Sequence, residues 1–93
     1  MHIGSLLIEL EITNGRTLKD KRQVIRSLLD RIRGRFNVSA AEVGQNDSVR
    51  YARLAAVGVA NDRVFLDGMM NKVADFIESE PRVVVVAQEM EFF

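Results

Sequence analysis

Four segments of the chain have the residue pattern of β-strands, and the first shows it most clearly. From Leu6 to Ile12 every second residue is large and apolar, and glutamates occupy two of the positions between them. A repeat of two places these apolar side chains on one face of a strand, which we predict over residues 3–12. We expect three further strands: a short edge strand at Val38–Val43, a strand rich in small residues at Tyr51–Ala60, and a last strand at Val83–Met90.

A first helical segment runs from Leu18 to about Arg35. Thr17 precedes it as the expected N-cap, and Asp20, three residues later, completes a variant of the capping box. Gly34 marks its end. One apolar stripe follows the helical repeat and comprises Leu18, Ile25, Leu28, Leu29, Ile32 and Phe36.

A second helical segment follows Ala60. We expect Asn61 to cap it, Asp62 to interact favourably with the helix dipole, and Glu80-Pro81 to end it. Its apolar stripe comprises Leu66, Met70, Val73 and Ile77, widened by Phe65, Met69 and Phe76.

The order strand, helix, strand, strand, helix, strand predicts the fold. Each strand–helix–strand unit crosses over in the right-handed sense. Two interleaved units give a four-stranded antiparallel sheet with both helices on one face. We therefore predict an α+β, ferredoxin-like βαββαβ sandwich that occupies residues 1–93 as a single domain. The first and third strands belong in the centre of the sheet, and the second and fourth at its edges.

Two helices on one face leave the other face of the sheet uncovered. Alternation predicts that the side chains pointing toward the helices are Leu6, Ile8, Leu10, Ile12, Leu54, Val84, Val86 and Met90. An apolar patch on the opposite face is typical of a contact surface, and a homodimer formed sheet against sheet is one hypothesis. The other is a half-apolar open face on a monomer. The proposed surface comprises Ile3, Leu7, Val43, Tyr51, Ala55, Val57, Val59, Val83 and Val85.

The chain has no formal net charge, but its charges are unevenly distributed. Residues 16–35 hold eight basic and two acidic residues, a net charge of +6, and the remainder carries −6. At about 100° per residue, several of these cations share one face of the first helix and match a row of phosphates. The alternative is a solvated helix face that keeps the protein soluble. The candidate nucleic-acid contacts are Arg16, Lys19, Lys21, Arg22, Arg26 and Arg33.

Several catalytic chemistries lack the residues that they need. The chain has no cysteine and a single histidine, His2, next to its start, which argues against thiolate catalysis, zinc binding and a serine–histidine–aspartate triad. Two carboxylate pairs, Glu9 with Glu11 and Glu89 with Glu91, would have to meet to hold a cation, and antiparallel strands are expected to place them at opposite ends. We therefore expect no metal, no cofactor and no enzymatic activity.

No segment predicts insertion into a membrane. The longest purely apolar run, from Val83 to Ala87, is far too short to span a bilayer, and the first residues lack a basic, cleavable signal. The absence of cysteine agrees with a reducing compartment. We expect a cytoplasmic protein with no membrane partner.

Three stretches form a recognisable combination: Thr17-Leu18-Lys19-Asp20-Lys21-Arg22, then Phe36-Asn37-Val38-Ser39 with Ala41-Glu42-Val43, then Val59-Ala60-Asn61-Asp62. Together they resemble the YlxP-like family of small bacterial proteins of unknown function, over essentially the whole chain. That family is similar to ferredoxin-like folds, and its genes often lie in clusters with those of translation initiation factor two and ribosome-binding factor A. The resemblance therefore implies an RNA- or ribosome-linked role. The chain differs at Val49, where members commonly carry an aromatic residue.

Two functional hypotheses result. The first is a non-enzymatic accessory protein that binds structured RNA or a ribosomal assembly intermediate through the basic first helix. The alternative is a homodimeric protein-interaction or small-ligand regulatory module that uses the uncovered sheet face. The sheet is a poor surface for stacking RNA bases, because that needs exposed aromatic side chains and only Tyr51 is available.

Overall fold

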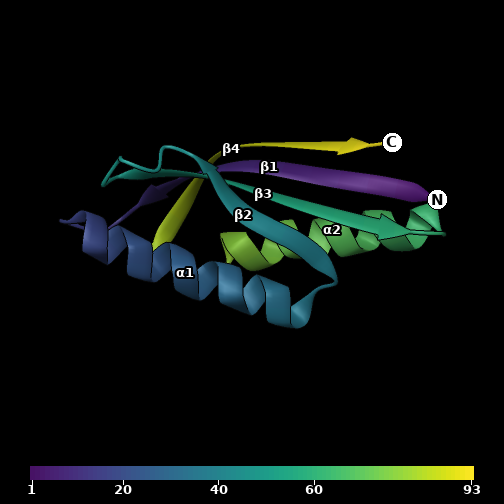
Figure 1. Ribbon diagram of the computed structural model, residues 1–93, viewed down its shortest axis with the longest axis horizontal. Coiled ribbons are helices and arrows are strands. Elements are labelled where there is room, and N and C mark those ends of the chain that lie inside the picture. The colour runs from purple at the N-terminus through teal and green to yellow at the C-terminus, as the bar shows by residue number, and fades with distance from the viewer.

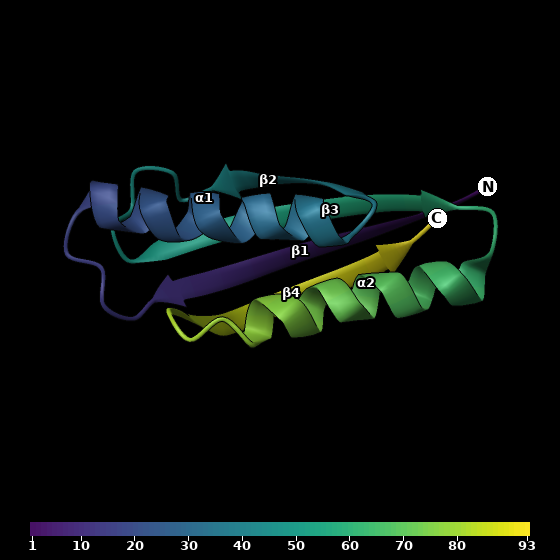
Figure 2. The same ribbon diagram turned by 90° about the horizontal axis from the view of Figure 1, so that it is seen from below.

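The computed structural model describes residues 1–93, the whole of the chain, as two layers. A twisted sheet forms one layer, and two helices lying side by side form the other (Figure 1; Figure 2). The elements follow one another as β1 (His2–Ile12), α1 (Leu18–Arg35), β2 (Val38–Gly44), β3 (Tyr51–Ala60), α2 (Arg63–Glu78) and β4 (Val83–Phe92).

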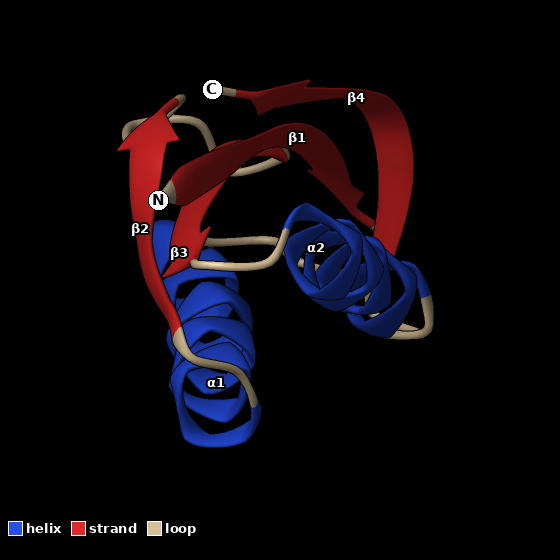
Figure 3. Cartoon of the chain, turned by 90° about the vertical axis from the view of Figure 1, so that its right-hand side faces the viewer, coloured by secondary structure: helices blue, strands red, loops and turns tan.

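The four strands form one antiparallel sheet in the order β2-β3-β1-β4. The first and third strands therefore occupy the centre and the second and fourth the edges, as predicted. Both helices lie on the same side of the curved sheet (Figure 3), with α1 along β2 and α2 mainly along β1. The predicted βαββαβ α+β fold is thus confirmed.

The core fills the space between the sheet and the helices. The apolar residues of β1 alternate as predicted, and Leu6, Ile8 and Leu10 are at most 1% exposed. Each such side chain contributes about 1.5–3 kcal/mol when it is fully buried. Gly58 on β3 leaves room for the methionine side chains of α2, because a Cβ at that position would lie 2.7 Å from Cε of Met69. The helices contribute Val24, Ile25, Leu28, Leu29 and Ile32 from α1, and Leu66, Met70, Val73, Ala74 and Ile77 from α2.

The start of α1 has the predicted capping box. The Thr17 hydroxyl accepts a hydrogen bond from the backbone N–H of Asp20 at 3.1 Å, and the Asp20 carboxylate accepts one from the backbone N–H of Thr17 at 3.2 Å. Two otherwise unpaired N–H groups are satisfied in this way. The capping box fixes where α1 begins and therefore which residues face outward.

The start and end of α2 differ from the prediction. Asp62, rather than Asn61, is the N-cap, because its carboxylate accepts backbone N–H groups of Val64 at 2.9 Å and Phe65 at 3.4 Å. Helix α2 ends at Glu78, two residues before the predicted end. Phe65 is 63% exposed, so it does not widen the apolar stripe as expected. Neither α1 nor α2 has the length and apolar character needed to cross a bilayer.

The prediction for the first half of β4 is wrong. Val83 is buried and Val85 packs against the core, whereas Val84 and Val86 are 51% and 54% exposed. A β-bulge in the pairing of β1 with β4 leaves Val86 without a partner, and the extra residue reverses the alternation. Beyond the bulge, Met90 packs against the core as predicted. A run of consecutive valines contains no alternation from which the bulge could be recognised.

We call the sheet face turned away from the helices the open face. The other residues predicted on it, apart from Val43, are placed there because they alternate with buried neighbours along their strands. Val43 is exposed at a second β-bulge, between Glu42 and Gly44. The bulge moves Val83 and Val85 to the helix side and puts Val84 and Val86 on the open face. Of the predicted residues that remain, Ile3 and Ala55 are partly buried, and the exposed ones are Leu7, Val43, Tyr51, Val57 and Val59.

Candidate nucleic-acid interface

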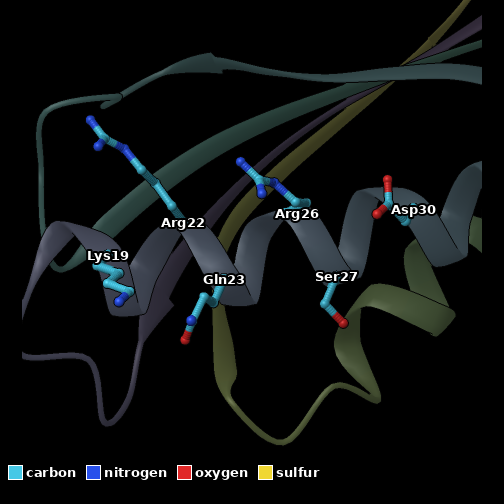
Figure 4. Close-up of a pocket in the computed structure, with 6 residues that line it drawn as sticks. All are labelled: Lys19, Arg22, Gln23, Arg26, Ser27 and Asp30. Carbon is cyan, nitrogen blue, oxygen red and sulfur yellow. The ribbon is translucent and has the colours of Figure 1, made fainter.

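The outer face of α1 carries three cations without a partner in the chain. Lys19, Arg22 and Arg26 are exposed, and their side chains take part in none of the ion pairs or hydrogen bonds of the molecule. Figure 4 shows Arg22 and Arg26 extending in parallel from the same side of the helix. At 1.5 Å per residue, Lys19 and Arg26 lie about 10 Å apart along the axis. That span corresponds to about three phosphates of one nucleic-acid strand.

Two surface hollows adjoin these arginines. The first is lined only by α1, and the second lies between α1 and β2. Arg22 and Arg26 line both, so an anion in either hollow would meet the same two guanidinium groups, whose forked donors match phosphate oxygens. The first is lined by Lys19, Arg22, Gln23, Arg26, Ser27 and Asp30 (Figure 4), and the second by Arg22, Ile25, Arg26, Leu29, Arg33 and Glu42.

Lys21 lies outside this surface, so the prediction that it contacts phosphate is wrong. Its side chain is only 1% exposed, and its Nζ lies 2.9 Å from Oε2 of Glu42 on β2. The same ammonium donates to the backbone carbonyl of Gln45, a residue in the left-handed region with φ 61°. Removing an ammonium from water is costly unless such partners replace the water. Lys21 therefore holds α1, β2 and the following loop together.

Arg33 is partly engaged in the fold. Its Nη2 donates to the carbonyl oxygen of Ala40 at 2.7 Å, on the outer edge of β2, and its Nη1 lies 3.5 Å from Oδ1 of Asp30. An edge strand has unpaired backbone groups that need such cover. Arg33 therefore helps to close the sheet edge, and its guanidinium is not free in the way that those of Arg22 and Arg26 are.

Arg16 enters from the loop before α1 with an exposed side chain. Its backbone N–H donates to the Asp20 carboxylate at 3.0 Å, and this hydrogen bond is the main cause that lowers the pKa of Asp20. The Asp20 charge is thereby held at the helix start. We call the free cations Arg16, Lys19, Arg22 and Arg26 the cation row.

A buried carboxylate, Glu80, was not recognised from the sequence. It is 5% exposed and lies in the loop between α2 and β4. Arg82 donates to it through Nε at 2.9 Å and through Nη2 at 2.9 Å, and Arg31 of α1 donates to it as well. The hydrogen bonds from Arg82, helped by Arg31, outweigh the effect of burial and lower the pKa of Glu80 to about 2. Arg31 therefore has a structural role. Its partner, Glu80, could not be recognised because the two residues are 49 positions apart in the sequence.

The carboxylates of the open face are not all isolated. Glu9 accepts from Arg53 through Nε at 2.8 Å, and Glu11 accepts from Arg50 through Nε at 2.6 Å. The pairs Glu9 with Glu11 and Glu89 with Glu91 were expected to lie at opposite ends of the sheet. This expectation is wrong for Glu9 and Glu89. Leu7 pairs with Glu89 in the register of β1 and β4, so Glu9 and Glu89 are diagonal neighbours in one hollow. No three acidic or histidine side chains of the chain converge as metal ligands.

A further hollow lies between the end of α1 and the start of α2, and the sequence pattern did not indicate it. Its walls combine apolar side chains with two cations, Arg35 and Lys72. Arg35 also lies over the ring of Phe76, 4.9 Å from its centre. Val64 and Phe65, two apolar residues in the first turn of α2, were the feature of the sequence that could have indicated this hollow. The hollow is lined by Arg35, Phe36, Asn37, Val64, Phe65, Gly68, Met69 and Lys72.

Comparisons with known proteins agree with this fold and identify relatives. The family described as "Protein of unknown function (DUF503)" matches residues 3–90. The chain is 31% identical over 91 residues to the uncharacterized protein YlxP of Bacillus subtilis (strain 168), covering 98% of this chain and 99% of that protein.

The fold is also shared with a solved structure of very different sequence. This is a mutant of SnoaB, a cofactor-independent oxygenase from Streptomyces nogalater, with a TM-score of 0.51 at 10% identity, covering 98% of this chain and 90% of that one. At this identity the likeness concerns the fold alone. The family match and the full-length relative show that the chain belongs to the DUF503 family of proteins of unknown function.

Proposed function

We propose that the chain is a non-enzymatic accessory protein that binds structured RNA, such as that of a ribosomal assembly intermediate, through the cation row. The observation that carries the proposal is the unpaired state of Lys19, Arg22 and Arg26 on adjacent turns of α1. Cations that satisfy carboxylates within the fold have little to gain from a phosphate. These three have no such partner, so binding a polyanion leaves no internal carboxylate unpaired.

The remaining surface favours contact with the sugar-phosphate backbone of RNA rather than with its bases. The cation row lies on a convex helix, and double-stranded RNA is recognised mostly through phosphates and 2′-hydroxyls of its shallow minor groove. Within its strands the open face bears one exposed aromatic side chain, Tyr51, and Phe93 pairs with Ile3 at the corner of the sheet. Two isolated rings are too few to stack successive bases. We therefore expect binding that depends on structure and salt more than on sequence.

The proposal that the protein is not an enzyme rests on the carboxylates that are already hydrogen-bonded within the fold. Glu9, Glu11 and Glu80 each accept hydrogen bonds from arginine. A general acid or base needs a pKa near the working pH, whereas the arginine partners of Glu80 hold its pKa far below that range. Carboxylates held in this way are suited to structural roles.

Filter retention of small-subunit ribosomal RNA tests the proposal. Retention is expected at about 50 mM salt, and for three to four phosphate contacts the affinity should fall roughly 40- to 150-fold at about 200 mM. The variant Arg22→Glu/Arg26→Glu should lose retention. As a control, Lys72→Glu on the exposed face of α2 makes half the charge change of the double variant, the same as Arg26→Glu alone, and should bind nearly as the parent chain does. Absence of binding at low salt, or a double variant that binds normally, would contradict the proposal.

A further inference from the structure

The exposed apolar side chains of the molecule are concentrated on the open face. Eleven large apolar residues are exposed, and seven of them lie there. The other four are at the chain ends or in the first turn of α2. Scattered exposure of single apolar residues is normal, whereas a contiguous patch marks a contact surface. The seven are Leu7, Val43, Tyr51, Val57, Val59, Val84 and Val86.

The charges along the two central strands of the open face, and at their end, are already paired within the chain. Arg53 Nη2 lies 2.5 Å from Oε1 of Glu9, and Arg50 Nη2 lies 2.5 Å from Oε2 of Glu11. Two identical copies of this region therefore bring neutral pairs together, and no uncompensated charge is buried. The acidic residues of this face without a partner are Glu89 and Glu91, both on the edge strand β4. Their position suits the polar rim of an interface.

The open face also has the size that a stable pair needs. Four strands spaced about 4.8 Å apart and about ten residues long cover roughly 600 Å² in projection. The accessible area of side chains standing on that plane is larger, and a standard interface takes about 800 Å² from each partner. One sheet face is therefore close to a complete interface, and a second copy supplies a face of equal size.

We infer that a second copy of this chain covers the open face, so that two sheets pack against each other about a twofold axis. An axis parallel to the strands places β4 of each copy over β2 of its partner. That arrangement keeps the carboxylates of the two β4 strands apart. It also leaves α1 on the outside of both copies, so the cation row remains accessible and this inference does not depend on RNA binding.

Sedimentation equilibrium over a wide concentration range tests the inference. The parent chain should have twice its mass of 10.5 kDa at high concentration. Val57→Arg, in the middle of the patch, should shift the mass to that of a monomer. Val64→Arg is the matched control, since Val64 is 81% exposed on α2 and away from the patch, and it should leave the dimer intact. A monomeric parent chain at every concentration would overturn the inference and would leave the face to a different partner.

Thiol labelling gives a second readout that does not require the arginine variant to fold. The chain has no cysteine, so a single introduced thiol is the only one labelled. Labelling of Val57→Cys should slow several-fold as the protein concentration rises through the dimerisation range, and labelling of Val64→Cys should not change. Equal, concentration-independent labelling at both positions would also overturn the inference.

Discussion

The cations of α1 fall into two groups that differ in what they touch. Lys21, Arg31 and Arg33 each have a polar partner within the fold: Glu42, Glu80 and the carbonyl of Ala40, respectively. Arg35, the last cation of the helix, belongs with them because it packs over the ring of Phe76. Lys19, Arg22 and Arg26 have no such partner and are exposed. The first group ties α1 to β2 and to the loop before β4. The second group adds little to the fold, so its positive charge is available to a partner.

This difference shows why the net charge of a segment is a weak guide to binding. Residues 16–35 carry a net charge of +6, but part of that charge is compensated by carboxylates from β2 and from the loop after α2. The contrast between the two groups is measurable, because one group should act on stability and the other on binding.

The largest effect is expected at Lys21. Lys21→Met keeps most of the apolar stem but leaves the Glu42 carboxylate without its partner. Because that carboxylate is only 17% exposed, unfolding free energy should fall by about 3 kcal/mol, which lowers Tm by roughly 10–20 °C. Thermal unfolding followed by circular dichroism measures the shift.

A paired variant and a neighbouring control sharpen the result. Lys21→Met/Glu42→Leu should recover much of the loss, since both charges are then removed. Lys19→Met, two residues earlier on the outer face, should change stability by less than about 0.5 kcal/mol. Equal losses at positions 19 and 21 would mean that the two groups are not distinct.

The next largest effect is expected at Glu80. Its pKa is lowered from 4.5 to about 2 in the folded chain, so the group stabilises the fold fully above about pH 4.5. That contribution is lost as the pH falls toward 2, because protonation of the carboxylate weakens its bonds to Arg82 and Arg31. Allowing for the solvent exposure of both arginines, Glu80→Gln should cost about 2 kcal/mol at neutral pH.

Denaturant unfolding at a series of pH values measures this contribution. Between about pH 5 and pH 2 the stability of the parent chain should fall more steeply than that of Glu80→Gln, so that the two curves converge. Parallel curves over that range would show that Glu80 does not supply the difference.

A smaller effect is expected at Arg33. Arg33→Ala removes the donor to the Ala40 carbonyl, which then faces solvent at the edge of β2. We expect a loss of about 1 kcal/mol, because water replaces part of the bond. Hydrogen exchange should become faster in β2 and remain unchanged in β4, and an unchanged β2 would argue that the contact is unimportant.

The smallest effects on stability are expected for the cation row itself. Arg22→Ala and Arg26→Ala should each change the free energy of unfolding by less than about 0.5 kcal/mol, since neither guanidinium has a partner. Both should still reduce RNA retention. A loss of more than 1 kcal/mol in chemical denaturation would place these arginines in the structural group.

The fold was predictable because its local patterns agree with one another. The alternation from Leu6 to Ile12, the stripe from Ile25 to Ile32 and the order of the elements all require the same two-layer arrangement. The capping box at Thr17 was predictable for the same reason, since it depends on residues close in sequence.

The features that were missed depend on contacts between distant residues or on register. The reversal at Val83–Val86 comes from a bulge opposite β1, and the role of Glu80 depends on Arg31, which is 49 residues away. Lys21 did leave a signal: it lies three residues after Leu18 and four before Ile25, within the apolar stripe. A charged residue in that position should be expected to point inward and to have a partner.

The salt dependence of RNA affinity tests the division of the α1 cations most directly. The slope of log K against log salt counts the phosphates contacted, at about 0.9 for each contact. With four contacts from the cation row, the parent chain should give a slope near −3.6, and Arg26→Gln should reduce its magnitude by about 0.9. Arg33→Gln should leave the slope unchanged. An unchanged slope in Arg26→Gln, or an equal reduction in Arg33→Gln, would contradict the account.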